Sequence, residues 1–166
     1  MEQNVIRQEN VKQYVQPGEL FPAIQEMLDM GFEVEFTVTG NSMWPLLRHG
    51  RDTVILKSRK SKKLKVGDIV LMKVGEGRYL LHRITSVRDN AIQTTGDGNC
   101  FRDGWFSQDC VIGYAVRVKR KGEELFLDER KWRISAAIWR ILFPFRKQIF
   151  KSWNLYKRIA CRVEEA

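Results

Sequence analysis

The sequence lacks long hydrophobic runs and has few residues suited to metal or redox chemistry. None of its apolar stretches reaches the roughly 18 residues that a membrane-spanning helix needs. Residues 1–16 are polar and mixed in charge, so we expect neither a secretory signal nor a membrane anchor there. Cys100, Cys110 and Cys161 form no Cys-x-x-Cys pair. This spacing argues against a zinc site and favours plain thiols in a reducing compartment, and we expect no cofactor.

The charge of the chain is concentrated at one end. The 166 residues fit one domain, and a hydrophobic content of 43% is enough for a real core. The net charge is +9, and residues 117–166 hold 14 lysines and arginines against 6 acidic residues. A basic tail on a nearly neutral body predicts an anionic partner for the tail, either a membrane surface or nucleic acid.

Hydrophobic periodicity divides the chain into three parts, 1–31, 32–128 and 129–166. Residues 1–18 predict a loosely ordered arm, and helical spacing over 19–30 predicts a short helix that ends at Gly31. Alternation predicts strands over 32–38, 53–56, 68–74, 79–87, 91–95, 111–118 and 124–127. The Gly-Glu-Gly sequence at 75–77 predicts a hairpin, and 96–109 predicts a long loop.

The tail, residues 129–166, returns to helical spacing. Two aromatic-rich faces are separated by Pro144, and they consist of Trp132, Ala136, Trp139 and Phe143, then Ile149, Trp153, Tyr156 and Ala160. Lysines and arginines fill the positions between them. This pattern fits a helix in a membrane interface, with contact through residues 131–162, and it fits equally two amphipathic helices that pack on the β-rich part.

A serine stands in the loop that follows the first predicted strand. The sequence over 40–45 is Gly-Asn-Ser-Met-Trp-Pro, in which Gly40 permits unusual backbone angles and Pro45 stiffens the turn. Such a loop can hold the hydroxyl of Ser42 exposed. A serine needs a base to become a nucleophile near neutral pH. The plainer interpretation is a serine that caps a turn.

The chain has two histidines, and His82 is the better candidate base. It lies in an apolar strand, where an imidazole needs a partner or water, and its type of side chain suits proton transfer near neutrality. A core histidine bonded to backbone would give the same pattern. His49 predicts a solvated turn residue. Asp97 or Asp103 is placed to accept the second imidazole proton, although either is also typical of a turn.

Four motifs in order resemble the signal peptidase I superfamily. They are Gly-Asn-Ser-Met-x-Pro at 40–45, Gly-Asp-Ile-Val at 67–70, His-Arg-Ile at 82–84 and Thr-Gly-Asp-Gly-Asn at 95–99, and the resemblance covers residues 36–118. The histidine motif resembles the endoplasmic-reticulum and archaeal type, in which histidine replaces the bacterial lysine. The resemblance implies Ser42 as nucleophile, His82 as general base, Asp103 as the third member and Asp97 as a brace of its loop.

The sequence departs from this family at two motif positions. Gly40 stands where the family often has a serine that helps the oxyanion hole, so we expect a hole of backbone N–H groups assisted by Asn41. Gly98 replaces the first asparagine of the aspartate motif. The resemblance implies a mainly β fold, a small coiled β-barrel of the signal peptidase and LexA-like catalytic type. We expect it to carry a short N-terminal helix and a basic amphipathic helical C-terminal tail.

The predicted function is that of a serine endopeptidase that cleaves a precursor or leader peptide, in the cytoplasm or at a membrane surface. One alternative is a LexA-like autoprotease, but that class uses lysine, and no Ala-Gly bond lies upstream of Ser42. The other is a non-catalytic binding module whose tail holds an anionic partner. No motif for reading nucleic acid is present, so a membrane is the expected anionic partner.

Overall fold

The body of the protein is one eight-stranded antiparallel sheet. The computed structural model describes residues 17–164, with side chains described over 20–156 except at Ser61, so most of the predicted arm 1–18 lies outside it. The strand order is β1-β2-β7-β3-β4-β5-β6, with β8 paired to β7. The strands are β1 (Val34–Thr37), β2 (Asp52–Ser58), β3 (Ile69–Val74), β4 (Arg78–Arg88), β5 (Ala91–Thr95), β6 (Trp105–Ser107), β7 (Val111–Arg120) and β8 (Glu123–Phe126).

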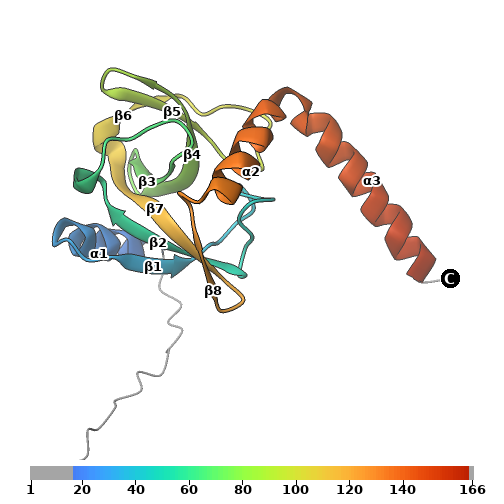
Figure 1. Cartoon of the computed structure of the whole chain (residues 1–166), viewed down its shortest axis with the longest axis horizontal. Coiled ribbons are helices and arrows are strands. Elements are labelled where there is room, and N and C mark those ends of the chain that lie inside the picture. Colours follow the sequence, from blue (N-terminus) through green and yellow to red (C-terminus); the bar gives the residue numbers. More distant parts are fainter. Residues whose placement is uncertain (1–16, 165–166) are drawn as a thin grey trace, which may run out of the picture.

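The mainly β class predicted from the sequence is confirmed. The sheet curls around itself (Figure 1), although β1 and β6, at the two ends of the described strand order, do not pair with each other. The predicted hairpin is present, since Val74 pairs with Arg78 across the 75–77 turn. β6 was missed because three residues are too few to show alternation within a polar loop.

A short helix covers one side of the sheet, as predicted. α1 (Pro17–Asp29) inserts Ile24 and Leu28 into the apolar core, where they meet strand residues such as Val54. Gly31 ends it with a φ of 91°, an angle that glycine adopts without a Cβ penalty. The apolar positions that predicted a helix over 19–30 are therefore on the face that α1 buries in the core.

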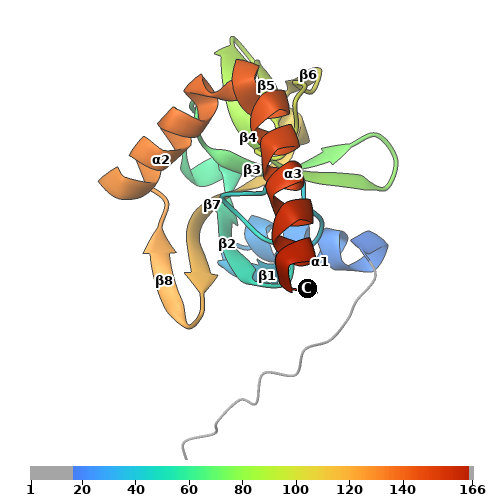
Figure 2. The ribbon, with the colours of Figure 1, turned by 90° about the vertical axis from the view of Figure 1, so that its right-hand side faces the viewer.

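The tail forms two helices that behave differently. α2 (Arg130–Ile141) packs its aromatic face on the sheet, with Ala136 buried and Trp132 against the core. A 3₁₀ turn, η3 (Phe143–Phe145), then separates α2 from the next helix, and it contains Pro144, where an interruption was predicted. α3 (Arg146–Glu164) projects from the body in Figure 1 and points towards the viewer's side in Figure 2, where it is drawn in front of the body. Within the part of the chain that the structure describes, no helix is long and apolar enough to cross a bilayer.

A buried carboxylate ties together the ends of β2 and β7. Asp52 is fully buried, and it accepts hydrogen bonds from Arg51 at 2.7 and 2.8 Å, from Arg120 at 2.9 and 3.0 Å and from the backbone of Arg48 at 2.9 Å. Burial alone would raise the pKa of Asp52, but the hydrogen bonds from Arg51 and Arg120 lower it to about 2. The ionised carboxylate therefore stabilises the fold.

Asp52→Asn is expected to lower the free energy of unfolding at pH 7 by about 2 kcal/mol, because one pKa unit corresponds to about 1.4 kcal/mol. The contribution of Asp52 is complete above its ordinary pKa of 3.8 and declines as the pH falls towards 2. Urea titrations across this range should therefore show a shallower loss of stability in the variant than in the wild type. Asp29→Asn, on the surface of α1, is the control. Equal acid sensitivity of wild type and Asp52→Asn would contradict the assignment.

Candidate active site

The loop that carries Ser42 is fixed from both ends. Gly40 has a φ of 78°, and its N–H donates to Nδ1 of His49 at 3.1 Å, so the second histidine supports the loop. Met43 and Leu47 are buried and anchor the loop in the core. Ser42 itself is half-buried, and its hydroxyl makes no hydrogen bond within residues 17–164. The backbone is thus held while the hydroxyl is left available.

The Ser42 loop contacts the 96–99 loop backbone to backbone. The N–H of Gly98 donates to the carbonyl of Ser42 at 2.7 Å. A Cβ at Gly98 would lie 2.5 Å from the carbonyl oxygen of Asn41, and one at Gly96 would lie closer still to that of Ser42. Side chains are therefore excluded at both positions.

Gly98→Ala should separate the two loops, because overpacking of this kind costs about 1–3 kcal/mol. Thermal unfolding measures the loss of stability. Hydrogen exchange of the backbone amide at position 98 reports whether its hydrogen bond to the Ser42 carbonyl is broken. Gly104→Ala is the matched control, since nothing lies within 4 Å of a Cβ at that position. An unchanged melting temperature in Gly98→Ala would show that the loops are less tightly packed than described.

A buried ion pair holds the 96–99 loop against β4. Arg83 and Asp97 are both buried, with Nε to Oδ1 at 2.9 Å and Nη2 to Oδ2 at 2.7 Å. The third guanidinium nitrogen, Nη1, donates to the carbonyl of Gly67 at 2.9 Å. This bidentate pairing is the strong form of an arginine–carboxylate contact. Asp97 thus binds Arg83, and it does not contact His82.

His82 has its carboxylate partner in Asp103. His82 is buried, and its Nδ1 lies 2.6 Å from Oδ2 of Asp103, which also accepts from the hydroxyl of Thr94 at 2.7 Å. Burial would raise the pKa of Asp103, but the hydrogen bonds from His82 and Thr94 lower it. An ionised Asp103 accepts the Nδ1 proton and so leaves Nε2 of His82 as the nitrogen that can take up a proton.

The strand register brings these groups to one end of the β4–β5 ladder. Arg83 pairs with Thr95, directly before the 96–99 loop that holds the Ser42 backbone. His82 is the neighbour of Arg83 and Asp103 follows the loop. Between the described residues, no hydrogen bond joins the Ser42 hydroxyl to the His82 imidazole, and the Asn41 side chain is likewise unbonded. The structure thus pairs His82 with Asp103 and links their neighbourhood to Ser42 through backbone.

Sequence reasoning missed the contribution of the tail to this site. Arg146, at the start of α3, is 1% exposed, and its Nη1 donates to the carbonyls of Gly96 and Asn99 at 3.1 Å each. Burial lowers the pKa of Arg146, while Asp97 acts in the opposite direction. Trp139 of α2 donates its indole N–H to the carbonyl of Asp97 at 2.8 Å. The tail therefore fixes the 96–99 loop from behind.

The tail also meets the Ser42 loop directly. The ring centroid of Trp44 lies 5.4 Å from that of Phe150 and 6.0 Å from that of Trp153, both on α3. Trp139 lies 6.0 Å from Phe150 and joins the same cluster. Aromatic pairs at such distances contribute about 0.5–1.5 kcal/mol each beyond their buried area. The projecting helix is therefore attached at its first turns to the loop that carries the serine.

Metal chemistry and known relatives give no further indication of function. Among the described side chains, no three of the types His, Cys, Asp and Glu gather as a metal ion would require, and Cys100 and Cys110 are free thiols. A scan against models of known protein families finds no match, and a search of curated proteins finds none either.

Proposed function

We propose that the protein is a serine endopeptidase on a coiled β-barrel of the signal peptidase and LexA-like type. The observation that carries this proposal is the 2.6 Å contact between buried His82 and Asp103, at the end of the sheet where the Ser42 loop is held. Ser42 is the nucleophile, His82 the general base and Asp103 the orienting carboxylate. The four motifs support the histidine-dependent type of that superfamily, and the substrate is a precursor or leader peptide.

Catalysis proceeds through an acyl-enzyme. The Ser42 oxygen attacks the scissile carbonyl carbon while its proton passes to Nε2 of His82, and Asp103 stabilises the imidazolium. When the tetrahedral intermediate collapses, His82 gives that proton to the leaving amine nitrogen. Water, deprotonated by His82, then hydrolyses the ester on Ser42. Backbone N–H groups of the loop, with Asn41, stabilise the oxyanion.

The absence of a hydrogen bond between the Ser42 hydroxyl and the His82 imidazole is compatible with this mechanism. Catalytic hydrogen bonds are often long or poorly aligned without substrate and tighten when it binds. The Ser42 hydroxyl is half-exposed and has no competing partner in the described chain, so rotation about one side-chain bond reorients it. The backbone, by contrast, is already fixed by Gly98.

Incubation with a proteome-derived peptide library, read by mass spectrometry, tests the mechanism. Wild type should cleave a defined subset of peptides, and Ser42→Ala and His82→Gln should each slow cleavage by at least about 1000-fold. Asp103→Asn should slow it at least about 100-fold, because the imidazole loses its orienting acceptor.

Asp109→Asn is the matched control, because Asp109 belongs to the same segment but its side chain is 74% exposed. It should cleave as the wild type does. Equal cleavage by wild type and Ser42→Ala would remove the peptidase proposal. Circular dichroism of each variant separates loss of activity from loss of fold.

We also propose that the tail contacts an anionic membrane surface. The aromatic face of α2 is used by the sheet, but Ile134, Ile138 and Ile141 lie on another face and are 48%, 52% and 72% exposed. Residues 130–164 contain ten basic residues and one acidic residue. An exposed apolar stripe beside excess cations is the composition of a helix that lies in a lipid interface. The same observation favours the binding-module alternative, should no peptide be cleaved.

Co-sedimentation with vesicles of phosphatidylcholine and phosphatidylglycerol tests the membrane proposal. Ile138→Ser together with Ile141→Ser should weaken binding at least about 10-fold, because two buried isoleucines contribute several kcal/mol. Met30→Ser with Phe32→Ser removes two equally exposed apolar side chains near α1 and should leave binding unchanged. Binding should fall when salt is added or phosphatidylglycerol is omitted. If both double variants bind alike, α2 does not face the lipid.

A further inference from the structure

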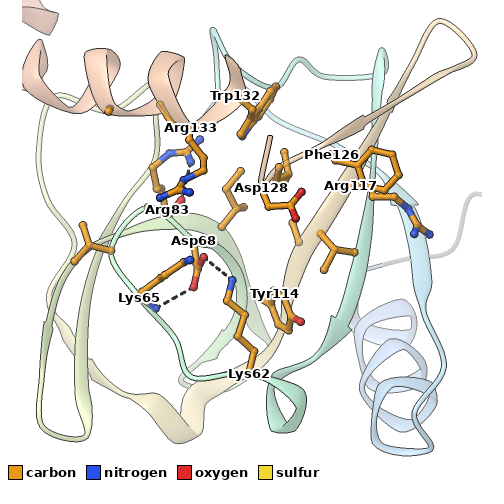
Figure 3. A pocket seen from close by; sticks show the side chains of 18 of the residues that line it. Lys62, Lys65, Asp68, Arg83, Tyr114, Arg117, Phe126, Asp128, Trp132 and Arg133 are labelled. Carbon is orange, nitrogen blue, oxygen red and sulfur yellow. Dashed lines mark hydrogen bonds and ion pairs between the residues drawn. The ribbon is translucent and has the colours of Figure 1, made fainter. Parts of the chain in front are cut away.

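A cavity of about 610 Å³ lies between α2 and the sheet, apart from Ser42, His82 and Asp103. Its walls come from strands β2, β3, β4 and β7, the 62–68 connector, the 126–128 segment and α2, as Figure 3 shows for Tyr114 below and Trp132 above. Its volume is in the range of small-molecule sites, about 300–1,000 Å³.

The cavity carries more positive charge than its own carboxylates neutralise. Seven lysines and arginines line it, and four of them are engaged in ion pairs: Lys57 with Glu33, Lys62 with Asp68, Arg83 with Asp97, and Arg117 with Glu33 and Glu124.

The other three cations, Lys65, Arg133 and Arg140, have no carboxylate partner among the described residues. The only lining carboxylate outside the ion pairs of the described chain is that of Asp128. Three cations against one anion leave an excess of two positive charges, which a single dianion would neutralise.

Aromatic side chains line the cavity from more than one direction. They are Tyr114, Phe126 and Trp132. The indole nitrogen of Trp132 is buried and has no hydrogen-bond partner within the described structure. The cavity therefore offers aromatic surface and unpaired cations together.

We propose that this cavity binds a phosphate monoester that carries an aromatic or short apolar body. The phosphate has a charge near −2 and three acceptor oxygens, which match the excess charge and the donors of Lys65, Arg133 and Arg140. The ester's organic body lies against Tyr114 and Phe126. A soluble aromatic phosphate and a phosphatidic acid share this chemistry. The inference is independent of the proposed peptidase activity, since none of its three catalytic residues lines the cavity.

Nuclear magnetic resonance on the full chain tests the proposal through the Trp132 indole, whose ¹H–¹⁵N signal is assigned with Trp132→Phe. Phenyl phosphate and dihexanoyl phosphatidic acid, each up to about 10 mM, should shift this signal saturably, and inorganic phosphate should bind more weakly. Phenol, which has the body without the charge, should not shift it. Whichever ester binds more tightly identifies the soluble or the lipid source.

Lys65→Gln with Arg133→Gln should weaken this binding at least about 10-fold. Lys63→Gln with Arg130→Gln removes the same charge from neighbouring positions that do not line the cavity, and it should bind as the wild type does. Ala137→Phe fills the cavity without altering charge and should also abolish the shift. Failure of both esters to move the Trp132 signal, or equal binding by all variants, would overturn the proposal.

Discussion

The buried pair of Arg83 and Asp97 is the constraint on which the candidate site depends. Two charges removed from water are tolerated only when they are well paired, and removal of one partner from such a pair typically costs about 3–5 kcal/mol. Here the pair fixes the 96–99 loop to β4, and the loop in turn holds the backbone of Ser42 through Gly98. The position of the serine relative to β4 is therefore set by an interaction that does not itself perform chemistry.

The tail is part of this arrangement as well as a basic appendage. Arg146 donates to the carbonyls of Gly96 and Asn99, and Trp139 donates to that of Asp97. On the same side, the ring of Phe150 packs on Trp44, two residues after Ser42. A lipid surface that engages the outer face of α2 would thus lie on an element that is rigidly connected to the loop. Packing of the tail on the sheet and contact of the tail with a membrane are therefore compatible, because α2 turns one face to the sheet and another to solvent.

Sequence predicted most elements but left open the pairing within the site. Alternation and glycine turns located the strands closely, and β5 was predicted with its observed bounds. Periodicity did not decide whether Asp97 or Asp103 meets His82. Successive side chains of a strand face opposite sides, so His82 and Arg83 require different carboxylates, and only the loop path assigns them. The burial of Arg146 depends on how the tail packs against the 96–99 loop. Nothing in the sequence distinguishes Arg146 from the other nine basic residues of the tail, so its role could not be predicted.

Ser42 and His82 are proposed to belong to one site, and a Ser42→Cys variant tests this without a substrate. Its alkylation rate against pH, followed by mass spectrometry of the residue-42 peptide, reports how readily the thiolate forms. A neighbouring imidazole promotes the thiolate, so we expect alkylation at lower pH in Ser42→Cys than in Ser42→Cys combined with His82→Gln. Identical pH profiles for the two proteins would contradict it.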